Sequence, residues 1–199
     1  MTAQHPLPGN LHRKTQLRLN LRQRRRRLSR LRQTLASRRI SQRAMFYVKK
    51  PHHRHIGFYF ANDGELNPAP LIDAALQYHK QCYLPSIGAN GILEFRLLPN
   101  QGNWREQLVR GRYGIYTAKP KQPKKRASEL DLVFVPLVGF DSKKRRLGMG
   151  GGYYDRSFAY RNNRSWTHTK LIGLAHRCQQ VDELPKDDWD IKLDKILCA

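Results

Sequence analysis

The residues whose types and spacing most clearly suggest chemistry lie between Arg146 and Asp155, in the segment Arg-Leu-Gly-Met-Gly-Gly-Gly-Tyr-Tyr-Asp. Glycines at positions 148, 150, 151 and 152 let backbone N–H groups approach a bound anion closely. Arg146 can offer a phosphate a planar pair of donors, and Asp155 can hold the magnesium ion that accompanies a nucleotide. A helix beginning near Tyr153 would add partial positive charge at its N-terminus. The segment therefore predicts a site for a phosphorylated ligand.

Two common phosphate-binding motifs do not fit this loop. A P-loop has Lys-Ser or Lys-Thr after its last glycine, whereas Tyr153 and Tyr154 follow here. The dinucleotide pattern GxGxxG would need a glycine at position 153. On these residues alone, a tight glycine turn between a strand and a helix stays open as the alternative.

The elements that must position the loop follow from apolar patterning. Leu130–Val135 is an almost continuous apolar run, as expected for a central strand buried on both faces. We expect further strands at Ile56–Phe60, Gln81–Leu84 (closed by Pro85), Leu93–Leu98, Gly114–Thr117, Leu171–Ala175 and Leu193–Leu197, helices at Ala69–Tyr78 and Tyr153–Tyr160, and a polar loop at Lys119–Arg126. Strands that alternate with helices predict an α/β fold, a single three-layer domain with a mainly parallel sheet flanked by helices.

The N-terminal part is expected to be a flexible basic tail at residues 1–13, followed by one domain, 14–199, that opens with a basic amphipathic helical segment. Between Lys14 and Tyr47 there is no proline or glycine, and leucines recur with helical spacing at positions 17, 21, 28, 31 and 35. This pattern predicts one helix, or two helices broken near Arg38–Ser41. The run RQRRRR, residues 22–27, is expected on the exposed face.

The positive charge of the chain is concentrated in this N-terminal part. The 199 residues hold 38 Lys and Arg against 15 Asp and Glu, a net charge of +23. Residues 1–62 contain sixteen of the basic residues and no acid, and the first acid is Asp63. Such an arm could bind polyanions non-specifically, although a solvated helix face is the simpler interpretation.

Several classes of protein are disfavoured. No apolar run reaches the roughly 18 residues that a membrane span needs, and the first residues have no signal-peptide pattern. Three widely spaced cysteines, Cys82, Cys178 and Cys198, favour reduced thiols and a cytoplasmic location. The histidines at 52, 53 and 55 have no matching second cluster, so a solvated loop is favoured over a metal site.

The segment PLVGFDSKKRRLGMGGGYYDRSF, residues 136–158, resembles the signature of the 5-formyltetrahydrofolate cyclo-ligase family, also called methenyltetrahydrofolate synthetases. Further blocks resemble the family in the same order: Lys14-Thr-Gln-Leu-Arg18, Phe58 to Leu66 with Pro70-Leu-Ile72, and Gly173 to Gln179 with Leu184-Pro185 and Trp189 to Asp194. The resemblance covers about residues 14–198. The glycine-tyrosine block is its most specific part.

The resemblance implies an enzyme, a ligase that converts 5-formyltetrahydrofolate to 5,10-methenyltetrahydrofolate and splits ATP to ADP and phosphate with Mg²⁺. It implies that the formyl oxygen attacks the γ-phosphate, after which N10 of the folate closes the ring and phosphate leaves. An amide-like oxygen is a poor leaving group until it is phosphorylated. The protein must therefore mainly place the substrates and neutralise charge.

The same resemblance implies roles for individual residues. Catalytic roles are expected for Arg146 and Tyr153. ATP is expected to bind Lys14, Arg18, Arg146, Leu147, Gly148, Met149, Gly150, Gly151, Gly152, Tyr153 and Tyr154. The folate is expected to bind Phe60, Glu65, Met149, Gly150, Gly151, Gly152 and Tyr153, and Mg²⁺ to bind Asp155 and Asp190. A carboxylate such as Glu65 can accept paired hydrogen bonds from the amino-pyrimidinone edge of a pterin.

The chain departs from the family pattern at Asn67 and Lys119, positions where many members carry an acid. Both departures leave substrate affinity open. The alternative function is a basic nucleic-acid-binding protein on a related but inactive fold; the charge bias before Asp63 favours it, and the intact glycine loop argues against it. We expect a monomer with a small-molecule folate substrate and no membrane partner.

Overall fold

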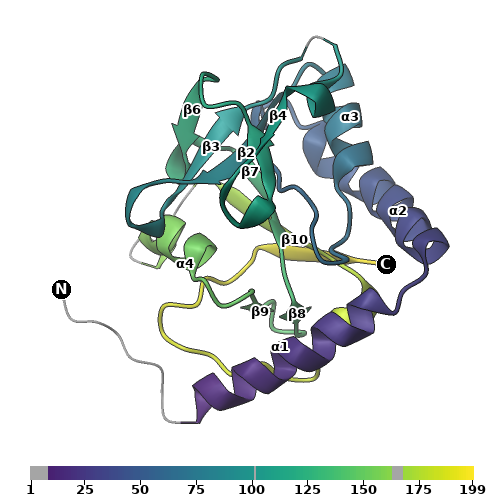
Figure 1. Ribbon diagram of the computed structural model, residues 1–199, viewed down its shortest axis with the longest axis vertical. Helices are drawn as coiled ribbons and strands as arrows, with labels where there is room; N and C mark the ends of the chain where they lie inside the picture. The colour runs from purple at the N-terminus through teal and green to yellow at the C-terminus, as the bar shows by residue number, and fades with distance from the viewer. Residues whose placement is uncertain (1–8, 101, 163–167) are drawn as a thin grey trace.

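The computed structural model describes residues 9–100, 102–162 and 168–199 (Figure 1). Its strands are β1 His55–Gly57, β2 Gln81–Ile87, β3 Leu93–Leu97, β4 Leu108–Arg110, β5 Tyr116–Ala118, β6 Lys124–Arg126, β7 Leu132–Pro136, β8 Gly139–Phe140, β9 Arg146–Leu147, β10 Lys170–Ala175 and β11 Lys195–Cys198. Seven of them form one sheet in the order β11-β10-β7-β1-β2-β3-β6. The pairs from β11 to β2 are parallel, and β3 and β6 join antiparallel. The predicted α/β fold with a mainly parallel sheet is confirmed.

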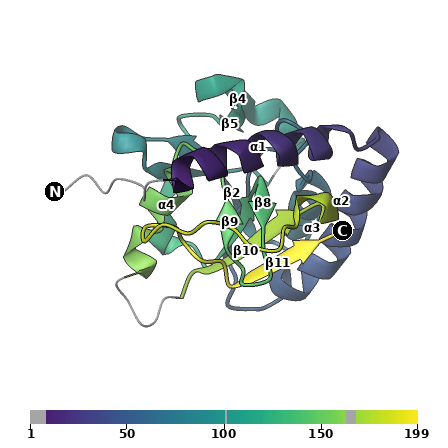
Figure 2. The same ribbon diagram turned by 90° about the horizontal axis from the view of Figure 1, so that it is seen from below.

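The helices lie around this sheet (Figures 1 and 2). They are α1 Asn10–Arg26, α2 Arg30–Val48, α3 Ala69–Gln77 and α4 Tyr153–Ser157, with short 3₁₀ helices at Ala89–Gly91, Trp104–Gln107, Arg112–Gly114, Ala127–Glu129, Ala159–Arg161 and Arg177–Gln179. Helices α2 and α3 pack together on one face of the sheet, and α1 runs beside the small hairpin formed by β8 and β9 (Figures 1 and 2).

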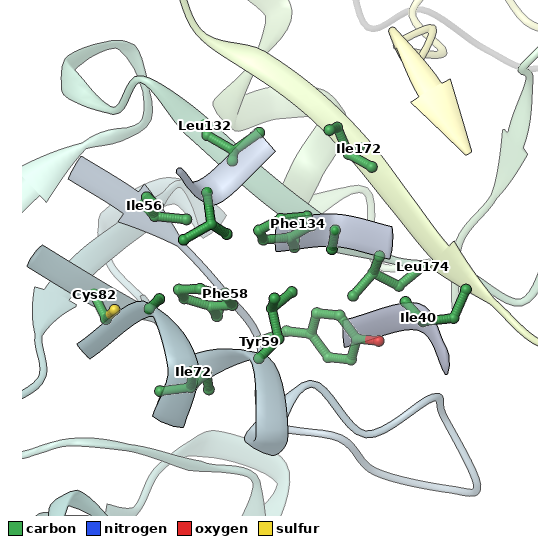
Figure 3. Close-up of a cluster of buried hydrophobic side chains, with 14 of the residues drawn as sticks. Ile40, Ile56, Phe58, Tyr59, Ile72, Cys82, Leu132, Phe134, Ile172 and Leu174 are labelled. Carbon is green, nitrogen blue, oxygen red and sulfur yellow. The ribbon is translucent and has the colours of Figure 1, made fainter. Parts of the chain in front are cut away.

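The side chains of β7 show why this strand is apolar throughout. Leu132 and Phe134 belong to the cluster beneath α2 and α3, whereas Val133 and Val135 belong to the cluster on the opposite face. In the first cluster, the rings of Phe58 and Phe134 stack with centroids 5.3 Å apart (Figure 3). A strand that buries both faces needs an apolar residue at every position, as the sequence pattern predicted.

The N-terminal segment forms two helices, but the predicted break near Arg38–Ser41 is wrong. The chain breaks at Arg27–Ser29, where Ser29 has an extended backbone and its hydroxyl accepts the Arg32 N–H at 3.3 Å as an N-cap. Residues 38–41 continue α2, because Ile40 is buried on its inner face. Helix α1 already begins at Asn10, so residues 10–13 are helical and do not belong to the expected tail. Residues 1–8 lie outside the described part of the chain.

Three strand assignments also differ from expectation. Pro85 does not close β2; it lies opposite Phe95, past the stretch of β2 that pairs with β1, so its missing N–H breaks no bond to β1 there. Residues 124–126, at the end of the expected polar loop, form the edge strand β6. In addition, β1 ends at Gly57 and does not reach Phe60.

Three simpler expectations can be compared directly. All three cysteines are free thiols, as predicted. Within the described ranges, no helix combines the length and apolar composition needed to cross a bilayer. Of the three histidines, His53 is buried and its Nδ1 lies 2.7 Å from the Tyr47 carbonyl oxygen, so it is a structural residue and not part of a solvated loop.

The capping role of Ser29 can be tested by its stability effect. Ser29→Ala should lower the free energy of unfolding by about 1 kcal/mol, because the Arg32 N–H loses its acceptor at the helix start. Urea denaturation would measure the loss. Thr34→Ala is the matched control, since Thr34 is exposed within α2 and alanine is the better helix former. Equal losses in the two variants would contradict the capping role.

Candidate functional site

The hairpin β8–β9 delivers Arg146 to the site, and one buried carboxylate fixes its turn. Asp141 accepts hydrogen bonds from the Arg145 backbone N–H at 3.1 Å, from Arg145 Nε at 2.6 Å and from the Leu184 N–H at 3.1 Å. Leu147, the residue after Arg146, packs its side chain in a small apolar cluster with Leu21 of α1. Residues 145–147 are therefore held firmly on both sides of the Arg146 side chain.

The glycine loop that follows lies close against α1. Gly150 and Gly152 have φ values of 104° and 65°, a region that disfavours other residues. The Arg18 Nε donates to the Gly148 carbonyl at 2.9 Å, and a Cβ placed on Gly150 would lie 3.6 Å from the Arg18 guanidinium carbon. The predicted helix after the loop is shorter than expected: α4 ends at Ser157, so its N-terminal dipole is small.

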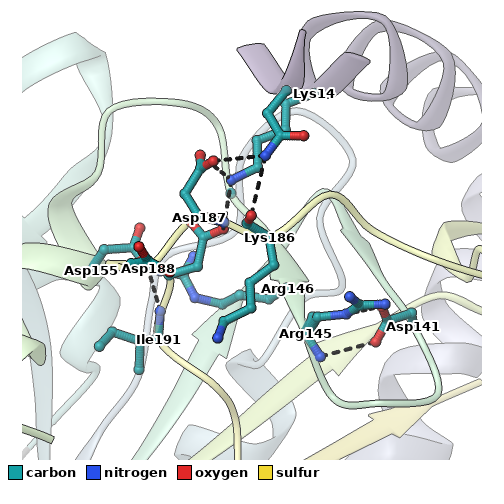
Figure 4. A network of polar contacts seen from close by, with 12 residues as sticks. Lys14, Asp141, Arg145, Arg146, Asp155, Lys186, Asp187, Asp188 and Ile191 are labelled. Atoms are coloured by element: carbon teal, nitrogen blue, oxygen red, sulfur yellow. Dashed lines mark hydrogen bonds and ion pairs between the residues drawn. The ribbon is translucent and has the colours of Figure 1, made fainter. Parts of the chain in front are cut away.

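Carboxylates from two distant segments meet the cations of α1 and β9 beside this loop (Figure 4). Lys14 Nζ lies 2.7 Å from Asp187 Oδ2 and 2.6 Å from Asp190 Oδ2. The Arg146 side chain, 5% exposed, pairs with Asp155 at 2.6 Å. The Ile191 N–H also donates to Asp155, at 3.2 Å, which joins α4 to the segment that carries Asp190. Four residues predicted from the sequence thus lie in one ionic network.

Arg18 lies within the field of the same carboxylates. Burial lowers the pKa of its guanidinium, and the negative charges of Asp190, Asp155 and Asp187 offset part of that effect. A partly desolvated cation bordered by carboxylates and by the glycine loop is suited to binding a phosphate oxygen.

A cavity of about 480 Å³ opens next to this network. Arg146 and Asp190 line it, together with cations that were not predicted from the sequence: Lys143, Arg145, Lys186 and Lys192. A concave, strongly basic surface attracts phosphates. These four residues had no distinguishing pattern in the sequence, because the chain contains so many basic residues.

Asp155 and Asp190, the two predicted metal ligands, could supply part of the coordination of a Mg²⁺ ion. Within the described ranges, no group of three or more His, Cys, Asp or Glu could hold a metal ion. Mg²⁺, however, is commonly bound by one or two carboxylates plus waters and substrate phosphates. Among the described residues, Asp155 makes its contacts through Oδ1 and Asp190 through Oδ2, and their side chains are 18% and 22% exposed. Two such carboxylates suit a metal that arrives with a nucleotide.

A second cavity, of about 320 Å³, is formed around the turn 62–65. Phe60 and Glu65, the predicted folate contacts, both line it, and Gln33 of α2 contributes from the other side. Asp63 and Gly64 have φ values of 53° and 75°, and the Glu65 N–H donates to the Asn62 carbonyl at 2.9 Å. Positive φ at both central residues is the type I′ pattern, for which Asp-Gly is a favoured sequence.

Burial raises the pKa of Glu65 to about 7, although the positive charge of Arg25 and a hydrogen bond from the Asn62 N–H both lower it. Burial raises the pKa of Tyr154, and the charge of Glu65 adds to the rise; the Tyr154 hydroxyl has no hydrogen-bond partner among the described residues. This interaction connects the second cavity with the glycine-tyrosine loop.

Two tyrosines that were not predicted from the sequence, Tyr113 and Tyr116, lie against predicted site residues. Tyr113, in the connection between β4 and β5, places its hydroxyl 2.8 Å from the Tyr153 hydroxyl. Tyr116 of β5 lies against Phe60, with ring centroids 5.2 Å apart. Tyr113 is 66% exposed and has a φ of 59°, so it occupies a strained position at the surface. Tyr113 and Tyr153 are 40 residues apart, so no local pattern could have joined them.

Not every predicted ligand presents its side chain to the site. The Leu147 side chain is in the core, so only its backbone could face a ligand, whereas Met149 is half exposed. The expectation that residues 22–27 lie on the exposed face is wrong for Arg25, which is fully buried. Arg22 is partly buried, and Arg26 is exposed, as expected, although both also pair with Asp63. Only carboxylates beyond residue 62 could receive these cations.

The departures from the family pattern have local structural roles. Asn67 Oδ1 accepts the Ala69 N–H at 3.0 Å at the start of α3, and Asn67 also lines the second cavity. Lys119 Nζ donates to Gln107 Oε1 at 2.8 Å on the surface. Neither residue takes the place of a predicted ligand.

The raised pKa of Glu65 predicts a pH-dependent stability difference between the wild type and Glu65→Gln. Between about pH 4.5 and pH 7 the folded protein holds a proton that the unfolded chain has lost. The contribution of Glu65 to the free energy of unfolding of the wild type is therefore complete below about pH 4.5 and decreases as the pH rises towards 7. Glu65→Gln should gain stability relative to the wild type across this window and then level off.

Urea denaturation at a series of pH values would measure this difference. Glu183→Gln is the matched control, because hydrogen bonds from Arg145 and Lys143 lower the pKa of Glu183. Relative to the wild type, Glu183→Gln should lose stability as the pH rises towards 4.5 and should show no change between pH 4.5 and pH 7. A difference between Glu65→Gln and the wild type that does not depend on pH would show that Glu65 is not held in a desolvating environment.

Comparison with known proteins gives the family. The model of the 5-formyltetrahydrofolate cyclo-ligase family matches residues 10–199. The chain is 35% identical to a 5-formyltetrahydrofolate cyclo-ligase of Haemophilus influenzae, over 94% of this chain and 98% of the relative, and 34% identical to one of Escherichia coli K12, over 89% and 95%. A 5,10-methenyltetrahydrofolate synthetase of Aquifex aeolicus has a similar fold, with a TM-score of 0.72, 26% identity and coverage of 93% and 89%. The predicted resemblance is confirmed, and the chain belongs to the 5-formyltetrahydrofolate cyclo-ligase family.

Proposed function

We propose that the protein converts 5-formyltetrahydrofolate to 5,10-methenyltetrahydrofolate with ATP and Mg²⁺ and releases ADP and phosphate. Family membership supports the reaction class. The observation that carries the proposal is that Arg146, which precedes the glycine loop, lines the basic cavity, whereas Tyr154, which follows the loop, interacts with Glu65 of the second cavity. One cavity suits a triphosphate and the other a folate ring.

The chemistry needs the two substrates to meet at one oxygen. The formyl oxygen forms a bond to the γ-phosphorus while the bond to the ADP oxygen breaks. N10 then attacks the activated carbon, loses its proton, and expels the former formyl oxygen as phosphate. The protein contributes placement and a field of positive charge where the phosphate carries its negative charge.

For the phosphates, we assign Arg146 and Arg18 as the principal ligands beside the backbone of the glycine loop. The Arg146 guanidinium is largely desolvated and the Arg18 guanidinium is partly desolvated, and Arg146 lines the basic cavity. Lys14, predicted as a third ligand, is paired with Asp187 and Asp190. A phosphate would therefore compete with Asp190 for the Lys14 ammonium group.

For the metal, Asp155 and Asp190 would hold Mg²⁺ through the oxygens that are not engaged with Arg146 and Lys14. When bound, the ion would neutralise charge on the transferred phosphate. For the folate, Glu65 would bind the amino-pyrimidinone edge, and Phe60, Tyr113 and Tyr153 would provide flat apolar faces for the ring.

All these groups come from one chain, which fits the proposal that the enzyme acts as a monomer. The alternative, a nucleic-acid-binding protein on an inactive fold, is not favoured: none of the predicted ligands is missing, and Arg22, Arg25 and Arg26 are engaged by Asp63.

An assay of ATP-dependent cyclisation, followed by the absorbance of methenyltetrahydrofolate, would test the proposal directly. Asp155→Asn should lower kcat about ten- to a hundred-fold, because it removes one charged metal ligand and keeps an oxygen for Arg146. Asp182→Asn removes the same charge at an exposed surface position and should leave kcat unchanged. No cyclisation by the wild type would overturn the function, and full activity of Asp155→Asn at saturating Mg²⁺ would overturn the assignment of Asp155.

We also propose a separate, non-specific contact with polyanions through exposed arginines of the helix pair α1–α2. Arg24, Arg27, Arg30 and Arg32 are exposed, and residues 1–62 contain no acid. If these residues bind phosphates by releasing counterions, the affinity for duplex DNA should fall steeply as salt increases.

Replacing these four arginines with glutamine should make the slope of log K against log[salt] shallower by about 0.9 for each phosphate that is no longer neutralised. The kcat should not fall. Arg25 and Arg26 stay in place, because they are paired with Asp63. Titration of labelled duplex DNA at several salt concentrations would measure the slope. An unchanged slope would show that the exposed arginines do not bind the DNA, and sequence-selective binding would favour a dedicated nucleic-acid function.

A further inference from the structure

The turn 62–65, which carries Glu65, is held by a group of arginines on α1 that lies outside the predicted site. Arg22 Nε donates to Asp63 Oδ2 at 2.7 Å, and Arg26 pairs with Asp63 Oδ1. Arg25 makes two contacts with the same residue, from Nε to the Asp63 carbonyl at 2.9 Å and from its terminal nitrogen to Asp63 Oδ2 at 3.0 Å. One aspartate at the tip of the turn thus receives three guanidinium groups.

Arg25 differs from its neighbours because its side chain is fully buried. Its other terminal nitrogen donates to the Leu137 carbonyl at 3.3 Å, just beyond the end of β7. The planar fork of Arg25 therefore connects the turn to the central strand of the sheet. Removing one partner from a buried ion pair is costly, because the remaining charge keeps no partner. The turn cannot move away from α1 without breaking this pair.

The helix that carries Arg25 is itself fixed to the rest of the site. Leu21, four residues earlier on the same face, is buried against the hairpin that positions Arg146, so closely that a Cβ on Gly139 would lie 2.5 Å from its Cδ1 atom. Near the start of the helix, Lys14 is held by Asp187 and Asp190. From Lys14 to Arg25 these contacts cover roughly 16 Å of α1. They connect the residues beside the basic cavity with the turn 62–65.

The charges around Arg25 are consistent with a permanent pair. Burial alone would raise the pKa of Asp63, but hydrogen bonds from Arg22 and Arg26 and the charge of Arg25 outweigh it and lower the pKa. His176 is also buried nearby; burial and the Arg25 charge lower its pKa to about 4, so it is neutral and does not compete for Asp63. Asp63 therefore stays ionised beside Arg25 near neutral pH.

We propose that Arg25 is a positioning residue for the folate: it sets the place of Glu65 by holding the Asp63–Gly64 turn on the same helix that contacts the nucleotide loop. Arg25 does not touch the substrate in this proposal, which rests on the proposed function of Glu65 as a folate ligand. The specific prediction is that Arg25 acts through Glu65.

Arg25→Lys is the first test, because lysine keeps the charge and cannot reproduce the fork. The Kd for 5-formyltetrahydrofolate, measured by calorimetry without nucleotide, should rise about ten-fold or more, as expected for the loss of hydrogen bonds to a charged group. The KM for ATP should change less than about three-fold, since the phosphate ligands are not altered. Arg24→Lys, at an exposed position in the same helical turn, is the matched control and should match the wild type.

A double-mutant cycle separates positioning from a general structural role. In a Glu65→Gln background, Arg25→Lys should weaken folate binding much less than it does in the wild type, because the residue being positioned has already lost its charge. Equal losses in both backgrounds, or a parallel rise in the KM for ATP, would overturn the inference. Asp63→Asn tests the other side of the pair if Arg25→Lys does not fold, since asparagine also tolerates a positive φ. It should weaken folate binding in the same Glu65-dependent way.

The outcomes also separate this inference from the proposed function. If the wild type does not bind 5-formyltetrahydrofolate or form methenyltetrahydrofolate, the proposed function fails. If the wild type is active and Arg25→Lys binds folate as well as Arg24→Lys does, only the positioning role of Arg25 fails.

Discussion

Lys14 and Arg25, the buried cations of α1, must pair with carboxylates that lie far along the chain, because the first 62 residues contain no Asp or Glu. Lys14 and Arg25 have side chains that are 8% and 0% exposed, and an unpaired charge in such a place would cost several kcal/mol. Asp63 and the pair Asp187 and Asp190 satisfy them. The helix can pack only if both of these segments come to it. Since one segment carries the turn with Glu65 and the other borders the basic cavity, the same constraint assembles both halves of the site.

The ion pairs also bear on how the site would accept its substrates. Asp155 and Asp190 are each neutralised by a cation, Arg146 and Lys14. Under the proposed function, a nucleotide that arrives with Mg²⁺ would offer a matched exchange, because phosphate oxygens would pair with the cations while the metal would bind the carboxylates. Groups already held in place for it need little reorganisation, which is the usual basis of electrostatic catalysis.

The sequence predicted those features that local patterns encode. A run of apolar residues was enough to predict the buried strand β7. The glycines between Arg146 and Tyr153 were enough to predict the glycine loop. The helix break was misplaced because Ser29 becomes a cap only when its hydroxyl meets the Arg32 N–H, and nothing in its neighbours distinguishes it from Ser37 or Ser41. The pairs Arg25–Asp63 and Tyr113–Tyr153 join residues 38 and 40 positions apart, and only the tertiary fold brings them together.

The arginine run shows most clearly what sequence alone leaves open. Residues 24–27 are chemically identical, so composition cannot tell which of them turns inward. The rotation of α1 decides, and apolar packing fixes that rotation, because Leu21 must face the cluster beside the β8–β9 hairpin. Successive residues on a helix differ by about 100°, so Arg25, four residues after Leu21, follows it into the interior, whereas Arg24 and Arg27 point to solvent. The packing of Leu21 therefore decides that Arg25 is buried and pairs with Asp63 in the turn that carries Glu65, whereas Arg24 and Arg27 remain on the charged surface.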